Sequence, residues 1–78
     1  MYSFKVLLAS KDGVKKFVHA AEEMDYDIDI GSGNCLVDAK SIVGVIGLDI
    51  SKPLNVRLHT DQQSEIDGLI NNIKEILV

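Results

Sequence analysis

The spacing of apolar residues along this chain changes repeatedly between a period of two and a period of about 3.6. Apolar and polar residues alternate from Tyr2 to Leu8, from Tyr26 to Ile30 and from Leu54 to Leu58. Apolar residues instead recur every three or four positions in Val14–Ala21, between the first two of these segments, and in Ile66–Leu77, after the last. Alternation is typical of a half-buried strand, and the longer period of a helix with one buried face. The sequence therefore predicts strands interleaved with amphipathic helices.

Two shorter segments complete the predicted order of elements. The small and polar residues of Gly31–Asn34 favour a tight hairpin, and Cys35–Asp38 is the predicted returning strand, with Cys35 buried in it. Ser41 is the predicted N-cap of a short helix that contains two glycines. The resulting order is β-α-β-β-α-β-α. Because each strand has one apolar face, we expect an α+β fold in which three helices cover one face of a four-stranded antiparallel sheet.

Polar residues also mark the starts of the two long helices. The Ser10 hydroxyl is placed to accept a hydrogen bond from a backbone N–H of the first turn, and Asp12 complements the helix dipole. Asp61 is the predicted N-cap of the last helix, which we expect to run nearly to the C-terminus. Helix capping thus explains the polar residues at both helix starts, and neither residue needs a catalytic role.

Length, charge and cysteine content limit the classes of protein that fit this sequence. Its 78 residues support one domain, spanning residues 1–78, and leave no room for a separate catalytic domain. The net charge of -4 opposes nucleic-acid binding, and no apolar run approaches the roughly 20 residues that span a bilayer. The lone Cys35 and the absence of a basic, apolar leader predict a reducing, cytoplasmic location.

The residues that bind metals or perform catalysis in other proteins do not form a recognisable motif here. His19 and His59 have no partners at metal-ligand or catalytic-triad spacing, so we expect structural or surface roles for them. The acidic repeat in Asp25–Asp29 begins like a calcium loop, but Ile30 stands at its glycine position and Leu36 at its closing glutamate position. We therefore expect no metal and no cofactor.

The segment Lys40–Leu48, which reads Lys-Ser-Ile-Val-Gly-Val-Ile-Gly-Leu, resembles HPr, the histidine-containing phosphocarrier of the bacterial sugar phosphotransferase system. The resemblance extends over essentially the whole chain through the element order, the chain length, and the spacing from Ala20-Ala21 to Lys40-Ser41. It implies the HPr fold, an open-faced β-sandwich. Of these features, only the Lys-Ser segment is specific to the family.

The chain departs from the motif that gives HPr its activity. HPr accepts a phosphoryl group from enzyme I on a histidine within Gly-x-His-x-Arg-Pro, at the start of its first helix. An ungapped alignment from Ala20-Ala21 places Ser10, Asp12 and Gly13 at the histidine, arginine and proline positions. A serine phosphoester is far more inert than phosphohistidine, and Asp12 brings a like charge to the phosphoryl oxygens. The resemblance thus implies a divergent, non-enzymatic member that lacks the active-site histidine.

Ser41 is the residue to which the resemblance assigns regulation. In many HPr proteins a dedicated kinase phosphorylates the serine of the Lys-Ser-Ile segment, which Ser41 matches. The apolar residues after that serine dock partner proteins in the family, so Ile42, Val43 and Ile46 are candidate docking residues. The implied partners are proteins: an HPr kinase, enzymes of the phosphotransferase system or a transcriptional regulator.

Three alternatives to a phosphorylation-controlled regulator remain open from the sequence. Ser41 is equally explained as an unmodified helix cap. A divergent phosphocarrier would accept a phosphoryl group on Ser10 or His19 instead. In the third alternative, the Lys-Ser-Ile segment is coincidental, and the chain is an unrelated small module that binds a ligand or forms oligomers on the same fold.

Overall fold

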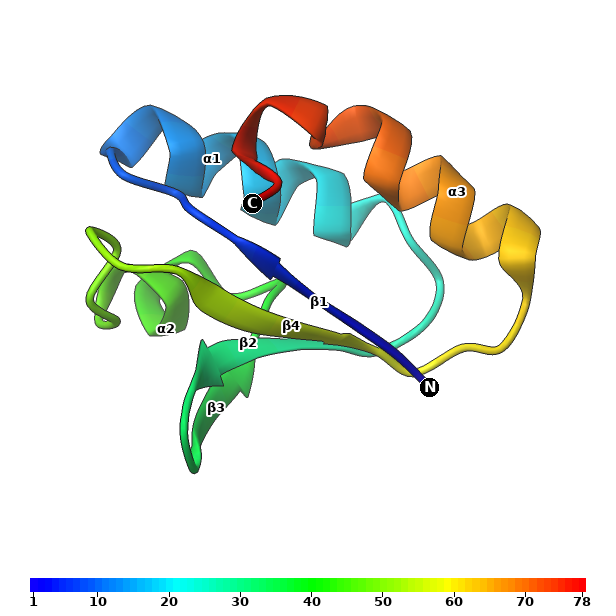
Figure 1. Cartoon of the computed structure of the whole chain (residues 1–78), viewed down its shortest axis with the longest axis horizontal. Helices are drawn as coiled ribbons and strands as arrows, with labels where there is room; N and C mark the ends of the chain where they lie inside the picture. The colour runs from blue at the N-terminus through cyan, green and yellow to red at the C-terminus, as the bar shows by residue number, and fades with distance from the viewer.

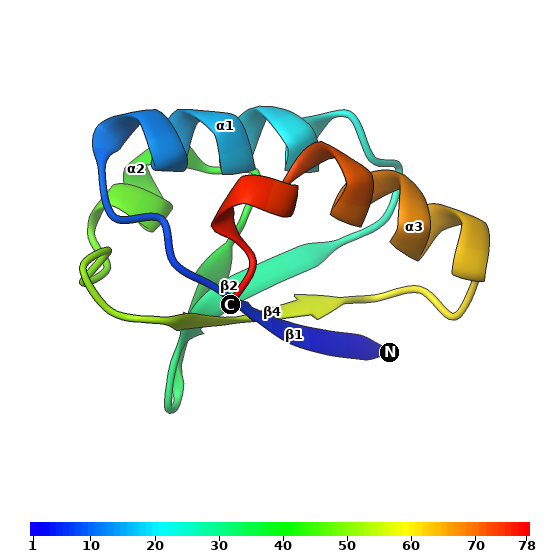
Figure 2. The same ribbon diagram turned by 45° about the horizontal axis from the view of Figure 1, so that its top comes forward.

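A four-stranded antiparallel sheet carries three helices on one of its faces (Figures 1 and 2). The computed structural model describes all residues from Met1 to Val78. Its elements are β1 (Tyr2–Val6), α1 (Lys11–Glu22), β2 (Ile28–Ser32), β3 (Cys35–Asp38), α2 (Ile42–Ile46), β4 (Leu54–Leu58), α3 (Gln63–Asn72) and a final 3-10 turn, η1 (Lys74–Ile76). This confirms the predicted fold class and order of elements.

The strand nearest the end of the sequence lies inside the sheet. The strand order is β1-β4-β2-β3, so β4 pairs with both β1 and β2. Val56, at the centre of β4, lies opposite Phe4 on one side and Ile30 on the other. Alternate residues of β4 are buried under the helices and exposed on the opposite face. The sheet therefore has one apolar face and one face open to water, as the alternation predicts.

The helices contribute their apolar stripes to a single core. All four predicted stripe residues of α1 are buried: Val14, Phe17, Val18 and Ala21. In the C-terminal segment, Ile66, Leu69 and Ile73 are buried, whereas Ile70 and Leu77 are half-buried against the core. The longest helix, α1, has 12 residues. No helix combines the length and the apolarity needed to cross a membrane.

The bounds of three predicted elements were wrong. Leu8 lies beyond β1, which ends at Val6. Tyr26 precedes β2 rather than starting it; its hydroxyl donates a hydrogen bond to the Glu65 carbonyl at 3.1 Å. Burial, with the nearby Glu65 carboxylate, raises the pKa of Tyr26. The last helix stops at Asn72, after which the chain turns and Val78 N–H bonds to the Lys5 carbonyl at 3.3 Å.

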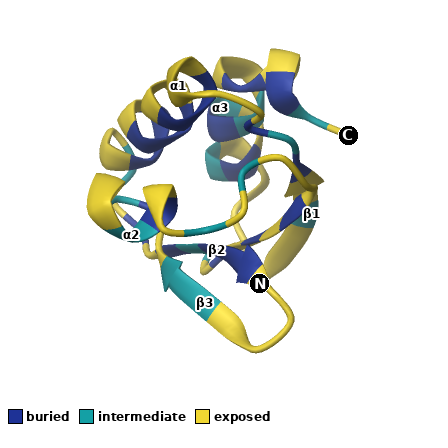
Figure 3. Cartoon of the chain, turned by 90° about the vertical axis from the view of Figure 1, so that its left-hand side faces the viewer, coloured by how far each residue is buried: buried dark blue, intermediate teal, exposed yellow.

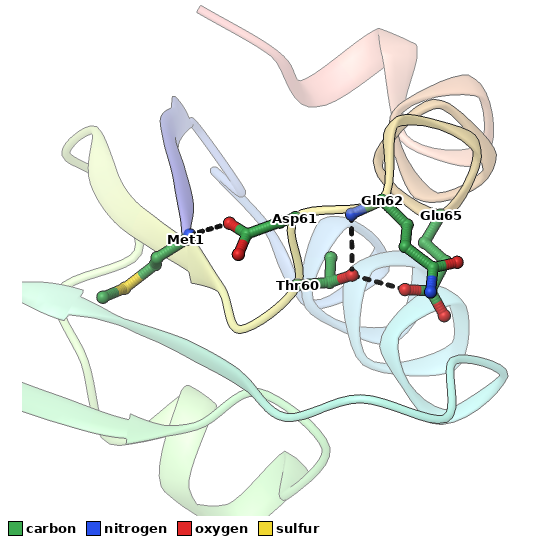
Figure 4. Close-up of polar contacts among 5 residues, drawn as sticks. All are labelled: Met1, Thr60, Asp61, Gln62 and Glu65. Atoms are coloured by element: carbon green, nitrogen blue, oxygen red, sulfur yellow. Dashed lines mark hydrogen bonds and ion pairs between the residues drawn. The ribbon is translucent and has the colours of Figure 1, made fainter.

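The predicted cap of the last helix was also wrong (Figure 4). The N-cap of α3 is Gln62, and the Asp61 carboxylate instead binds the N-terminal ammonium of Met1. This contact lowers the pKa of the Asp61 carboxyl. Thr60 Oγ1 accepts a hydrogen bond from Gln62 N–H at 3.2 Å and donates one to the Glu65 carboxylate. The start of α3 is therefore ordered by Thr60 rather than by Asp61.

Cys35 is exposed, which corrects the expectation that it is buried. It lies opposite Ser32 at the end of the β2–β3 hairpin, next to the turn in which Gly33 has a φ of 57°. Figure 1 shows this hairpin projecting away from the helices. A side chain at the end of the hairpin consequently lies outside the helix-covered core.

Gly13 in α1 and Gly68 in α3 provide a matched test of the packing at the start of α1. A Cβ at Gly13 would lie 1.9 Å from the Leu8 carbonyl oxygen, whereas a Cβ at Gly68 would meet nothing within 4 Å. We expect Gly13→Ala to lower the free energy of unfolding by about 2 kcal/mol or more, because backbone must move. We expect Gly68→Ala to raise it by about 0.5–1 kcal/mol through helix propensity.

Urea denaturation followed by circular dichroism measures both changes. Gly13→Ala shifting the midpoint upward, in parallel with Gly68→Ala, would contradict the close approach between Gly13 and Leu8.

Candidate functional site

The start of α1 and the whole of α2 lie at the same end of the molecule, on the left in Figure 1. Ser10 is the N-cap of α1, with an extended backbone, and its Oγ accepts a hydrogen bond from Gly13 N–H at 3.3 Å. The predicted cap is confirmed. Asp12 follows in the first turn and is exposed. The Ser10 hydroxyl therefore already has a structural role at the start of α1.

The residue before Ser10 has a strained backbone. Ala9 is the only non-glycine residue with a positive φ, at 66°. Ser10 N–H bonds to the Leu8 carbonyl at 2.7 Å, which closes a three-residue γ-turn around Ala9. Ala9 N–H donates to the Ile50 carbonyl at 2.8 Å, in the loop between α2 and β4. The second bond comes from a distant segment. The loop after α2 therefore holds Ala9 in its strained backbone conformation.

Neither histidine lies beside Ser10. His19 is exposed on α1, nine residues after Ser10, and its Nε2 lies 3.1 Å from Glu23 Oε1. At a rise of about 1.5 Å per residue, this separation is about 13 Å along the helix axis. His59 follows β4, and its Nε2 lies 2.7 Å from Asp29 Oδ2. Each histidine thus pairs with a carboxylate away from the start of α1.

Ser41 is the N-cap of α2, as predicted, and its side chain is exposed. Its Oγ accepts a hydrogen bond from Gly44 N–H at 3.3 Å. The preceding Lys40 extends its Nζ to the Met24 carbonyl, 2.8 Å away, just past the end of α1. Lys40 therefore fixes the entry into α2 against α1. Sequence reasoning missed this role because the two residues are 16 positions apart and share no local pattern.

Three of the apolar residues of α2 face solvent. Ile42, Val43 and Ile46 are 44%, 78% and 49% exposed, whereas Val45 is fully buried in the core. Figure 3 views this end of the molecule and shows how much of α2 is exposed. With only five residues, α2 turns a single side chain fully into the core. We call the exposed surface of Ile42, Val43 and Ile46 the apolar patch.

The arrangement at this end of the molecule is an open surface. The two hollows on the protein surface lie elsewhere, one beside Lys16 and His19 and the other beside Lys5 and Arg57. No group of three or more His, Cys, Asp and Glu side chains is placed to hold a metal ion. An exposed apolar patch beside an exposed hydroxyl is a geometry suited to contact with another protein.

Two comparisons with known proteins find matches. A family model described as "PTS HPr component phosphorylation site" matches residues 12–77. The fold is similar to the crystal structure of HPr-C-His from Thermoanaerobacter tengcongensis, with a TM-score of 0.76 and 22% sequence identity. That alignment covers 96% of this chain and 93% of the other. No curated protein matches the sequence. The family-model match begins two residues after Ser10.

The strained turn before Ser10 predicts an unusual response to glycine. Replacing Ala9 with glycine should raise the free energy of unfolding by about 0.5–1 kcal/mol, because glycine adopts a positive φ without a steric penalty. The Ala20→Gly variant is the control, since Ala20 lies buried within α1. There the same substitution should lower stability by about 1 kcal/mol or more. Chemical denaturation of both variants gives the answer, and a loss of stability in Ala9→Gly comparable to that in Ala20→Gly would exclude strain at Ala9.

Proposed function

The chain belongs to the PTS HPr family, and from that premise we propose that it is a regulatory, protein-binding member rather than a histidine phosphocarrier. The family serves the bacterial sugar phosphotransferase system. The observation that carries the proposal is the apolar patch, which directly follows the exposed Ser41. In this proposal, the patch docks a partner protein in the cytoplasm, and phosphorylation of Ser41 controls the docking.

The start of α1 argues against carrier chemistry. A carrier needs an acceptor that both takes and releases a phosphoryl group near neutral pH, and imidazole meets this need better than a hydroxyl. The hydroxyl of Ser10 is held as a helix cap, and the negative Asp12 lies in the same first turn. The two histidines are paired with Glu23 and Asp29 at other places. The residues at this position thus favour a structural start to α1.

Ser41 is suited to modification without loss of α2. Its Oγ is exposed, and the Gly44 N–H that it now binds could donate to a phosphate oxygen instead. A phosphate adds about -1.5 to -2 charges at neutral pH. Because Ile42 is the next residue, that charge would stand at the rim of the apolar patch. A partner with arginines or lysines around an apolar pocket would gain affinity, and a purely apolar one would lose it.

Incubation with an HPr kinase and ATP tests the proposed modification. We expect intact-mass spectrometry to find one added phosphate on the wild-type chain and on Ser10→Ala, and none on Ser41→Ala. The Ser10→Ala variant is a matched control because both serines cap helices through a bond of 3.3 Å to a glycine N–H. Phosphate on Ser41→Ala, or none on the wild type, would contradict the assignment.

The same samples, incubated with enzyme I and phosphoenolpyruvate, test the carrier alternative. We expect no phosphoryl group to reach the chain, while an authentic HPr in a parallel reaction becomes phosphorylated. An acid-labile phosphohistidine at His19, or transfer onward to a sugar permease subunit, would establish the divergent phosphocarrier instead.

The apolar patch predicts a second outcome, in binding to the kinase. Val43→Glu should weaken that binding tenfold or more, because a charge at the centre of an apolar contact must be desolvated. Val78→Glu is the control, since Val78 is 68% exposed and lies at the C-terminus. Surface plasmon resonance measures both affinities. Equal affinities for Val43→Glu and Val78→Glu would rule out the patch as the docking surface.

A further inference from the structure

The face of the sheet opposite the helices carries a concentration of hydrogen-bond donors on β1 and β4. Ser3, Lys5, Asn55 and Arg57, together with Phe4, line a shallow hollow of about 270 Å³. In the register of the sheet, Ser3 lies opposite Arg57, and Lys5 lies opposite Asn55. Figure 2 shows that no helix covers this face. Four donor side chains therefore occupy adjacent positions of two paired strands, open to solvent.

The two positive charges of this hollow are not neutralised by the protein. Neither Lys5 nor Arg57 has a carboxylate within 4.0 Å. Asp29 on β2 is the residue directly opposite Arg57 and its natural partner. Its Oδ2 is instead bound by His59 Nε2, at 2.7 Å. Arg57 is thus left with its donors available, in a chain whose net charge is -4.

We propose that the hollow binds the phosphate group of a small phosphate monoester. A guanidinium presents a planar pair of donors to phosphate oxygens, and an ammonium adds a point charge. The Asn55 amide and the Ser3 hydroxyl can each donate a further hydrogen bond. Arg57 alone could satisfy the oxygens of a carboxylate. The four donor side chains together suit a dianion with three acceptor oxygens.

The acidic strands beside the hollow favour a small ligand over a polyanion. Asp29 on β2 and Asp38 on β3 are cross-strand partners, and Asp29 lies one strand away from Arg57. A nucleic acid or an acidic protein extending across the sheet would meet these carboxylates and be repelled. A single phosphate group would remain within the β1–β4 half of the face. This site shares no residue with the apolar patch or with Ser41, so it is independent of the proposed function.

A titration with methyl phosphate tests the site on the whole chain. Two-dimensional ¹H–¹⁵N spectra are recorded above pH 7, where the monoester is a dianion because its second pKa is about 6. We expect saturating shifts of the amides of Ser3, Lys5, Asn55 and Arg57. Arg57→Gln should weaken binding about tenfold, and the double variant with Lys5→Gln should abolish saturation. Lys15→Gln, which removes one exposed lysine charge from α1, is the matched control and should leave the affinity unchanged.

Two comparison ligands separate phosphate recognition from simple charge attraction and from the binding of an acidic protein. Sodium acetate at equal ionic strength should bind at least tenfold more weakly than methyl phosphate, and hexaglutamate should not compete for the hollow. Comparable affinity for acetate would show a simple charge effect and overturn the proposal. So would shifts that remain linear with concentration, shifts that persist in the double variant, or saturable binding of hexaglutamate alone. The dispersion of the variant spectra shows directly whether each variant is folded.

Discussion

The insertion of β4 between β1 and β2 is the constraint on which the rest of the structure depends. Its inward residues, Leu54, Val56 and Leu58, are almost completely buried and set the register of both neighbouring strands. The chain must therefore bring its N-terminal segment and its central hairpin together around a strand that comes late in the sequence. Once β4 is in place, its alternation assigns one face of the sheet to the helices and the other to solvent.

This division gives the two faces different chemistry. On the helix side, the core takes the apolar stripes of α1 and α3, but the short α2 leaves Ile42, Val43 and Ile46 exposed next to Ser41. A surface of this kind suits a protein partner. On the other face, the outward residues of β1 and β4 gather donors around Lys5 and Arg57. The fold thereby places the apolar patch and the donor-lined hollow on different surfaces.

Contacts between distant segments determine the local geometry of the candidate site. The strained Ala9 is held by the Ile50 carbonyl, and Lys40 joins the entry of α2 to the Met24 carbonyl. These bonds connect the start of α1, the loop after α2 and the end of α1 into one framework. Ser10 and Ser41 both cap helices within it, yet only Ser41 is followed by exposed apolar residues.

The sequence by itself determined the order of elements, the faces of α1 and β4, and the caps Ser10 and Ser41, because period and capping depend on residues close together in the chain. It did not determine the exposure of Cys35, the pairing of Asp61 with the N-terminus, or the early end of α3. Nor did it show which residues of α2 remain exposed, or that the Asp29 carboxylate would pair with His59 rather than with Arg57. Those features depend on the positions of segments far apart in the sequence, and only the folded sheet and its helices bring these segments into contact.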